Sequence, residues 1–354
     1  MKITAIEYFR LEMPLSNPYT IAYETISETT NIILKITTNT GLTGWGCSAP
    51  DVEVTGETAD DVCKNIENIV IGLLEGQNPF QIALFNNTLK QLCPKASSTR
   101  AMVDIALHDL LARQAKLPLY QLLGGYRKQI PTSITIGILP LTETLSQAKE
   151  FFNQGFTIIK LKGGLQLDED IEKVLKLRET FGQKFRLRFD ANQGYTLQDS
   201  INFMNTTKSA NIEIFEQPTL QENESLLGKV TQHVEIPVMA DESIKTLKDT
   251  FRLASNEVID MVNIKIMKVG GIMESQHINS VAKAGGIEVM VGCIDECALG
   301  ISAGLHFALS RPNIEFADLD GHLDLLQDPF KNLFELKDGI LIPSDQPGLG
   351  KITI

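Results

Sequence analysis

The 354-residue sequence predicts an α/β fold in which a (β/α)8-type, TIM-like barrel follows an α+β unit formed by the first third of the chain. Three observations support this prediction. Antiparallel strand patterns and then helical patterns occupy the chain up to about residue 125. Eight short apolar runs alternate with helix-like segments after residue 130. Charged residues stand at the ends of nearly all of these runs.

The first part of the chain has the pattern of three antiparallel strands followed by helices. The segments "KITAIEYFRLEM", "TTNIILKITT" and "GLTGWGCSA" have strand-like patterns, and residues 39–41 ("NTG") form the turn between the last two. Helical periodicity follows over 58–74, 79–92 and 97–114. Ser97 or Ser98 is a suitable N-cap for the third helix.

The rest of the chain repeats one unit. Short apolar or β-branched runs begin near Ser133, Thr157, Arg186, Ile212, Pro237, Asp260, Glu288 and Ile314. Their starts lie 23 to 29 residues apart, about the length of one strand–loop–helix–loop unit, and a helix-like segment follows each of the first seven. Eight such units favour a closed parallel barrel. An open, doubly wound sheet is the alternative that the alternation alone also allows.

Composition and charge exclude several classes of function. With 43% hydrophobic and 21% charged residues the chain is an ordinary globular protein. Its net charge of −12 and lack of a basic run argue against a nucleic-acid partner. No apolar run approaches the roughly 20 residues that cross a bilayer, and the N-terminus does not resemble a signal peptide. We therefore expect a cytoplasmic protein with reduced cysteines and no membrane partner.

Three acidic residues stand at the ends of successive strands of the predicted barrel, where the chemistry of such barrels takes place. Asp190, Glu216 and Asp241 end the third, fourth and fifth strands, 26 and 25 residues apart. A single acid at a strand end is usually a loop cap. Three together form a set of hard oxygen ligands with coordination positions left open, which suits Mg²⁺. The sequence therefore predicts a Mg²⁺ site.

Lysines flank this predicted metal site. In "TIIKLKGG" Lys160 and Lys162 must share one face of the second strand, and "MVNIKIMKVGG" on the sixth strand carries Lys265 and Lys268. Lys162 and Lys268 can then face each other across a metal-bound ligand. A carboxylate on Mg²⁺ has an acidified α-proton, but a base must be neutral to take it. We expect Lys160 and the metal to lower the pKa of Lys162 from about 10.4. Ordinary solvent-seeking lysines are the alternative.

The motifs "KLK", "DANQG", "EQP", "ADES" and "KIMKVGG" together resemble the enolase superfamily, in its muconate-cycloisomerase-like subgroup. The resemblance extends over nearly the whole chain. It implies an α+β capping domain at 1–125, a catalytic barrel at 126–322, and a C-terminal tail at 323–354 that returns to the capping domain.

The resemblance also implies roles for the strand-end residues. The three acids bind Mg²⁺, and Lys162 and Lys268 are acid/base lysines on opposite faces of the substrate. Asn192, in "DANQG", and Lys265 stand beside these groups without being the reacting ones.

The eighth strand narrows the choice within the subgroup. Its "FADLDG" resembles the Asp-x-Asp pair of the dipeptide epimerases, whose carboxylates bind the substrate's α-ammonium group. Here the pair is Asp318 and Asp320. Two aspartates on the same face near three further acids are expected to bind a cationic group. The alternative is that they cap a helix or loop. Muconate cycloisomerases and succinylbenzoate synthases act on ligands that have no free ammonium, so a dipeptide epimerase is favoured.

The first loop of the capping domain, "NPYTIAYETIS", bears on substrate choice. The best-known dipeptide epimerases act on Ala-Glu and carry an arginine in this loop, which meets the glutamate side chain. Glu24 stands in its place here, and the loop holds no Arg or Lys. We expect Tyr19, Ile21 and Tyr23 to line an apolar or aromatic pocket for the C-terminal residue of the dipeptide.

Further acids surround the expected entrance. Asp51 and Glu53 lie in "APDVEVTGE", and "GCIDECALG" holds Asp295, at a position that is often apolar, and Glu296, which matches an acid common in the subgroup. An acidic entrance disfavours an anionic side chain by about 1 kcal/mol or more per close pair. We therefore expect Ala-Glu to be a poor substrate and the N-terminal residue to be neutral or cationic.

The expected activity is that of an isomerase, a Mg²⁺-dependent dipeptide epimerase. It would invert the α-carbon of the C-terminal residue by two-base 1,1-proton transfer through a metal-stabilised enolate. The alternatives are another enzyme of the subgroup (a cycloisomerase, a succinylbenzoate synthase or N-acylamino acid racemase) and a non-catalytic binding homologue. We expect a small-molecule dipeptide as partner and a homo-oligomeric assembly.

Overall fold

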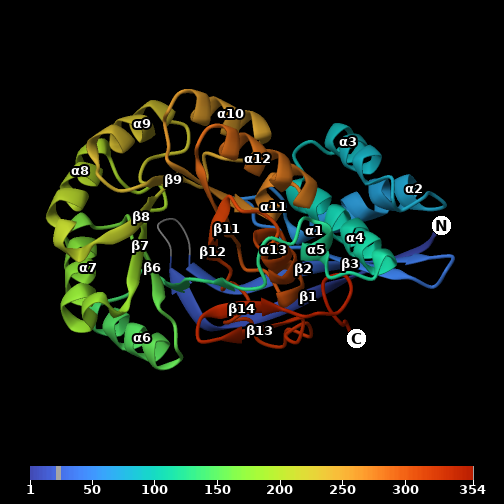
Figure 1. Ribbon diagram of the computed structural model, residues 1–354, viewed down its shortest axis with the longest axis horizontal. Coiled ribbons are helices and arrows are strands. Elements are labelled where there is room, and N and C mark those ends of the chain that lie inside the picture. Colours follow the sequence, from blue (N-terminus) through green and yellow to red (C-terminus); the bar gives the residue numbers. More distant parts are fainter. Residues whose placement is uncertain (21–24, 354) are drawn as a thin grey trace.

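The computed structural model describes residues 1–20 and 25–353. The protein is built around a parallel sheet of eight strands, which is surrounded by helices (Figure 1). A three-stranded antiparallel sheet with further helices lies beside it. These parts correspond to the predicted barrel and the predicted α+β unit. The loop residues Ile21, Tyr23 and Glu24, which we expected to contribute to substrate choice, lie outside the described residues.

The parallel sheet is the predicted barrel. Its strands are β5 (Ile134–Ile136), β6 (Ile158–Lys162), β7 (Arg186–Asp190), β8 (Ile212–Glu216), β9 (Val238–Ala240), β10 (Met261–Lys265), β11 (Glu288–Gly292) and β12 (Ile314–Asp318). Each begins within one residue of its predicted start. A parallel bridge between Thr132, just before β5, and Ala317 in β12 joins the two edges of the sheet. The barrel is therefore confirmed, because an open sheet would keep these edges apart.

Helices follow the first seven strands as predicted. They are α6 (Leu141–Asn153), α7 (Leu167–Phe181), α8 (Leu197–Thr206), α9 (Glu224–His233), α10 (Leu247–Ser255), the pair α11 (Ile266–Val269) and α12 (Ile272–Ala284), and α13 (Ala298–Ala308). Single 3₁₀ turns follow α7 (Gly182–Lys184) and α8 (Lys208–Ala210). A capping box starts α8 at Thr196 and α10 at Thr246, so local sequence determines where these helices begin.

The register of the barrel strands brings the strand-end residues to one edge. Lys162 pairs with Asp190 between β6 and β7, and Asp190 pairs with Glu216 between β7 and β8. On the other side Gly292 of β11 pairs with Asp318 of β12. Because neighbouring strands end level with one another, their last side chains share the carboxyl-end mouth of the barrel.

The N-terminal sheet has the order β1 (Ile3–Thr20), β2 (Thr25–Thr38) and β3 (Thr43–Ser48). The helical segments are α1 (Ala59–Asn65), a π-helical turn (Ile66–Val70), α2 (Ile71–Leu74), α3 (Ile82–Leu92), α4 (Ser97–Ala115) and α5 (Leu119–Leu122). The helix expected over 79–92 begins only at Ile82, because Asn78 Oδ1 accepts a hydrogen bond from Phe80 N (3.2 Å) and turns the chain there.

Helix α4 lies between the antiparallel sheet and the barrel and is buried over most of its length. Glycines in β3 allow its close approach, since a Cβ at Gly46 would lie 2.0 Å from the Met102 carbonyl oxygen. The expected serine cap of α4 is wrong: the N-cap is Ala96, and Glu57 accepts instead from Ser98 N (2.7 Å). A carboxylate supplied by another segment thus satisfies the first turn.

The C-terminal tail forms the hairpin β13 (Phe334–Lys337) and β14 (Ile340–Pro343), which pairs with β4 (Ile130–Pro131). The tail also meets the N-terminal part, because Leu325 bridges to Leu15 and Leu349 N donates to Asp109 Oδ1 (2.8 Å). The domain limits given above stay a prediction. Across residues 1–20 and 25–353, no helix has both the length and the apolar character needed to span a bilayer.

Candidate active site

Three buried carboxylates form the centre of the barrel mouth. Asp190 and Glu216 are the last residues of β7 and β8, and Asp241 directly follows β9. One oxygen from each lies within 4.8 Å of the others. All three side chains are at most 2% exposed. A set of three carboxylate oxygens with no nitrogen or sulfur donor fits Mg²⁺ rather than a softer metal.

Lys160 joins these acids to the Asp-x-Asp pair of the eighth strand. Its Nζ lies 3.1 Å from Asp190 Oδ2, 2.8 Å from Glu216 Oε2 and 2.9 Å from Asp318 Oδ2. Burial by itself lowers the pKa of Lys160, but the surrounding carboxylates raise it well above its usual value. Lys160 is therefore positively charged, as it must be if it is to lower the pKa of Lys162. That lowering stays a prediction.

The two expected acid/base lysines reach the acids from different sides. Lys162 Nζ lies 2.7 Å from Asp190 Oδ2. Lys268 Nζ pairs with the carboxylate of Asp241 and also donates to Asn263 O (3.2 Å). Lys268 stands on α11, beyond the end of β10, and not in the strand itself. Burial lowers the pKa of Lys268 although Asp241 acts in the opposite direction.

Two polar residues, Lys265 and Asn192, contact these acids. Lys265 Nζ lies 2.7 Å from Asp241 Oδ2. The main-chain N–H of Asn192 donates to Asp190 Oδ1 (2.9 Å), and its side-chain nitrogen donates to Glu242 Oε1 (3.2 Å). Both residues therefore contact the acidic centre, as the resemblance implies.

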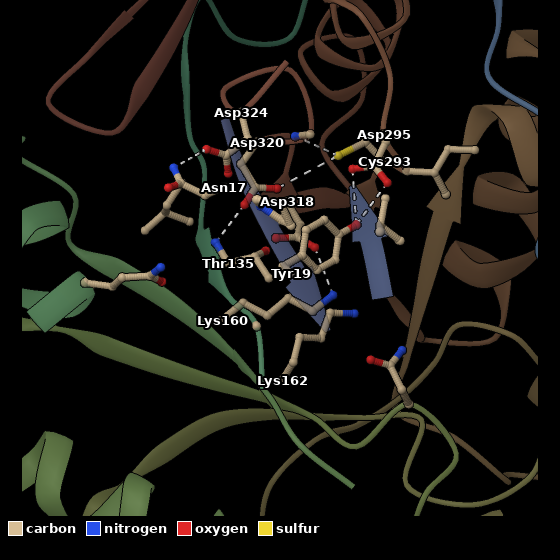
Figure 2. Close-up of a pocket in the computed structure, with 18 of the residues that line it drawn as sticks. Asn17, Tyr19, Thr135, Lys160, Lys162, Cys293, Asp295, Asp318, Asp320 and Asp324 are labelled. Carbon is tan, nitrogen blue, oxygen red and sulfur yellow. Dashed lines mark hydrogen bonds and ion pairs between the residues drawn. The ribbon is translucent and has the colours of Figure 1, made fainter. Parts of the chain in front are cut away.

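Asp318 and Asp320 lie at the same mouth, and both line the cavity (Figure 2). Ser133 Oγ donates to Asp318 Oδ1 (2.6 Å), and Thr135 N donates to Asp320 Oδ2 (2.6 Å). Burial and the Asp318 charge raise the pKa of Asp320 to about 7. A buried Asp318 and a half-buried Asp320 that repel each other are a site at which a cation is stabilised.

The cavity above these residues encloses about 200 Å³ and also contains Tyr19, Asp51, Asp295, Lys162 and Lys265 among its walls. Tyr19 Oη donates to both carboxylate oxygens of Asp295 (3.1 and 3.0 Å), as the dashed lines of Figure 2 show. Burial raises the pKa of Asp295 to about 6. A residue of the antiparallel sheet thus closes over a loop of the barrel.

Family models match both parts of the chain. Residues 143–352 match the enolase C-terminal domain-like family, and residues 4–124 match the N-terminal domain of the mandelate racemase / muconate lactonizing enzyme family. The chain belongs to the enolase superfamily. The resemblance inferred from the motifs is therefore confirmed.

Individual members of the superfamily are similar to this chain over nearly its whole length. The "L-Lys-D/L-Arg epimerase" of Desulforapulum autotrophicum is 39% identical, with 99% of each chain covered. The L-Ala-D/L-Glu epimerase of Bacillus subtilis, solved in a substrate-liganded complex, has a TM-score of 0.96 at 34% identity, covering 99% of this chain and 98% of that one. A dipeptide epimerase of Enterococcus faecalis, solved with Mg and L-Leu-L-Tyr, has a TM-score of 0.94 at 35% identity, with 99% of each covered.

Some expected site residues of this superfamily member do not reach the cavity. Glu53 is exposed on the second capping loop and is not a lining residue. Glu296 is buried, and its Oε1 accepts from Ile294 N (3.2 Å) in its own turn. Burial raises the pKa of Glu296 to about 8. The expected contact of these two acids with substrate has no support in the geometry, because one faces solvent and the other faces the chain.

Several residues around the site were missed. Asn263 is buried on β10 and its Nδ2 donates to Glu216 Oε1 (2.7 Å). Strand alternation could have found it, since Asn263 and Lys265 lie two residues apart on one face. Ser133 and Thr135 also hold the Asp-x-Asp pair, but a Ser and a main-chain N–H carry no sequence signal for that role.

Proposed function

We propose that this protein is a Mg²⁺-dependent dipeptide epimerase that inverts the α-carbon of the C-terminal residue. One observation carries the proposal. Two lysines from different elements contact acids at two ends of the Asp190–Glu216–Asp241 set, and Lys162 lines the same cavity as the Asp318/Asp320 pair. A substrate with both a carboxylate and an ammonium group fits such a site.

The residues divide the reaction between them. When held by the three acids, Mg²⁺ supplies positive charge that acidifies the α-proton of a substrate carboxylate. Asp318 and Asp320 hold the ammonium group and so orient the dipeptide. One of Lys162 and Lys268 takes the α-proton, breaking the C–H bond, and the other delivers a proton to the opposite face of the same carbon. The product is the epimer, with no change in mass.

We further propose that the enzyme disfavours dipeptides ending in Glu. Asp51 and Asp295 come from two separate loops and both line the cavity, so an anionic side chain would meet two acids. The aromatic ring of Tyr19 and the apolar side chains of Ile134 and Phe151 line it as well. These walls suit a hydrophobic or aromatic C-terminal residue and a neutral or cationic N-terminal one. Relatives named as an L-Lys-D/L-Arg epimerase and an L-Ala-D/L-Glu epimerase, and one solved with L-Leu-L-Tyr, are 39%, 34% and 35% identical to this chain. These similar values do not favour one substrate, so the proposal is argued from the residues that line the cavity.

A library of dipeptides incubated with the enzyme in D₂O tests the activity. Epimerisation incorporates one deuterium at the α-carbon of the C-terminal residue and changes its configuration. Cycloisomerisation or dehydration would be seen as a different product from muconate or acid-sugar panels. Lys162→Ala and Lys268→Ala should each abolish epimerisation while leaving exchange from one epimer.

A surface lysine provides the control for this experiment. Lys208 is exposed and pairs with Glu235 on the surface (2.6 Å), so Lys208→Ala should epimerise at the wild-type rate. If both single variants at Lys162 and Lys268 also epimerised normally, the two-base assignment would be wrong.

A further inference from the structure

The turn that follows Lys162 has no room for side chains. A Cβ on Gly163 would lie 2.3 Å from the Phe189 ring and 2.7 Å from Asp170 Oδ2. Gly164 has φ +101°, and a Cβ there would lie 2.1 Å from the Ala191 carbonyl oxygen. The two glycines are therefore needed for the loop after β6 to pass directly against its neighbours.

One buried carboxylate holds this turn in place. Asp170, in the first turn of α7, is 1% exposed. Its Oδ2 accepts from Gly164 N (2.8 Å) and from Tyr195 Oη (2.8 Å). Gly164 lies two residues after Lys162, and Tyr195 belongs to the loop that follows Asp190. A single oxygen thus ties the loop of an acid/base lysine to the loop of a metal ligand.

Tyr195 is a rigid partner for that carboxylate. Its ring packs in a cluster with Phe189, Phe203 and Phe215 at centroid distances of 6.1, 5.6 and 6.3 Å, and its N–H donates to Pro218 O (2.9 Å). Because the ring is held on several sides, its hydroxyl gives Asp170 a fixed point relative to β7 and β8.

The turn after Lys268 repeats the arrangement with different elements. Gly270 and Gly271 follow α11 with φ of +98° and +121°, and a Cβ on Gly271 would lie 2.6 Å from Asp104 Oδ2. That oxygen accepts from Ile272 N (2.5 Å) and Met273 N (3.2 Å), the first residues of α12. Asp104 is fully buried and comes from α4, in the N-terminal part of the chain.

We propose that Asp170 and Asp104 are positioning residues, each setting the reach of one acid/base lysine through a Gly–Gly turn. Asp170 acts on Lys162 and Asp104 acts on Lys268. The inference rests on the proposed function and deepens it, because each carboxylate should affect proton transfer on one face of the substrate. The capping helix α4 then controls one base while the barrel helix α7 controls the other.

The test measures α-proton exchange in D₂O separately from each epimer of one turned-over dipeptide. Lys162→Ala and Lys268→Ala first identify which epimer each lysine deprotonates. Asp170→Asn should then slow kcat for exchange from the epimer assigned to Lys162 by about 100-fold, with KM little changed, because misplacement of a base by about 1 Å costs that much. Asp104→Asn should instead slow exchange from the epimer assigned to Lys268. Asp170→Asn and Asp104→Asn therefore serve as controls for each other.

Loss of fold is separated from loss of position by a third buried aspartate. Asp109, also on α4 and fully buried, accepts from Trp45 N (3.0 Å) and Leu349 N (2.8 Å) and touches neither turn. Asp109→Asn should lower the melting temperature without favouring either epimer. If Asp170→Asn does not fold, Tyr195→Phe replaces it in the test. This variant removes one donor to Asp170 but keeps the carboxylate, so it should slow exchange from the epimer assigned to Lys162 by less than 100-fold.

Equal slowing of both epimers by Asp170→Asn and by Asp104→Asn would overturn the positioning roles while leaving the proposed function intact. A wild-type enzyme that exchanged the α-proton of no dipeptide would overturn both. The two failures can be told apart. The positioning roles can fail only in an experiment in which the wild-type enzyme is active and Lys162→Ala and Lys268→Ala each retain exchange from one epimer.

Discussion

Asp295 combines burial, charge and a contact with the capping part of the chain in one residue. Its carboxylate accepts from Tyr19 Oη, and its main-chain oxygen accepts from Asn31 Nδ2 (3.0 Å). Asp51 and Lys162 also act on its titration, and burial raises the pKa of Asp295 to about 6, so it carries a charge at neutral pH. A half-buried charge in a substrate cavity, as on Asp295, repels an anionic side chain more strongly than a fully exposed charge does.

We therefore expect Asp295→Asn to relax the discrimination against dipeptides ending in Glu. The ratio of kcat/KM for Ala-Glu to that for Ala-Leu should rise about fivefold, which corresponds to removing about 1 kcal/mol of repulsion. Steady-state epimerisation of the two dipeptides, followed by polarimetry, measures the ratio. Glu53→Gln removes an exposed acid outside the cavity lining and should leave the ratio unchanged. An equal rise in both variants would contradict the role of Asp295.

Individual residues were predictable where strand ends determine position. Asp190, Glu216 and Asp241 lie together because parallel strands end at one edge, and their spacing in the chain already indicated this. Asp295 and Glu296 were both expected to contact substrate, yet of the two only Asp295 lines the cavity. The direction of a side chain in an irregular loop depends on the hydrogen bonds that the folded loop makes, which no periodicity reveals.

At the scale of elements, α13 and α5 are joined by a histidine that must stay neutral. Tyr120 N donates to His306 Nδ1 (3.0 Å), so that nitrogen serves as an acceptor. Burial lowers the pKa of His306 to about 3 from its usual value near 6.5. A depressed histidine pKa stabilises the fold fully above pH 6.5, and this stability is lost as the pH falls toward 3.

The free energy of unfolding should therefore fall between pH 7 and pH 4.5, with about 2–3 kcal/mol of the loss due to His306. Urea unfolding at both pH values, compared with His306→Gln, isolates this contribution. Glutamine can still accept from Tyr120 N but does not titrate, so the variant should lose less stability over the same interval. The same pH dependence in both proteins would contradict the assignment.

The helices and strands agree with the prediction where local sequence signals are strong. They differ from it where a residue distant in the chain makes the decisive contact. The capping-box threonines start α8 and α10, and all eight barrel strands begin within one residue of the prediction. Helix α4 begins at Ser97 as predicted, but its expected serine cap was wrong because Glu57, 41 residues away, accepts from Ser98 N. Lys268 was expected at the end of a strand and lies instead on α11.

At the scale of the whole molecule, Asp190, Glu216 and Asp241 stand at the ends of three neighbouring barrel strands. A divalent cation bound to all three would link these strands. Anything that binds the native state alone raises stability by RT ln(1 + [L]/Kd), which is about 2.7 kcal/mol when the free ligand is 100 times Kd. Thermal unfolding in MgCl₂ should therefore occur at a higher temperature than in EDTA. EDTA should also abolish epimerisation, and added Mg²⁺ should restore it.

Asp190→Asn is the control for the metal experiment. It removes one charged ligand and keeps the size of the side chain, so it should lose most of the MgCl₂-dependent rise in melting temperature. NaCl at equal ionic strength should give no such rise with the wild-type protein. A rise of the same size in Asp190→Asn would show that Mg²⁺ acts elsewhere. The expected homo-oligomer stays a prediction, which light scattering can measure.

The barrel, the starts of its strands and the positions of Asp190, Glu216 and Asp241 could be predicted from periodicity within each segment and from regular spacing between segments. The Asp-x-Asp pair and the choice of Lys268 came instead from the resemblance of their motifs to a family. Other contacts could be seen only once the chain had folded: Tyr19 meets Asp295, 276 residues away, and Asp104 accepts from Ile272 N after the Gly–Gly turn, 168 residues away. Contacts between distant segments depend on how packed elements meet, and that geometry leaves no repeat in the chain.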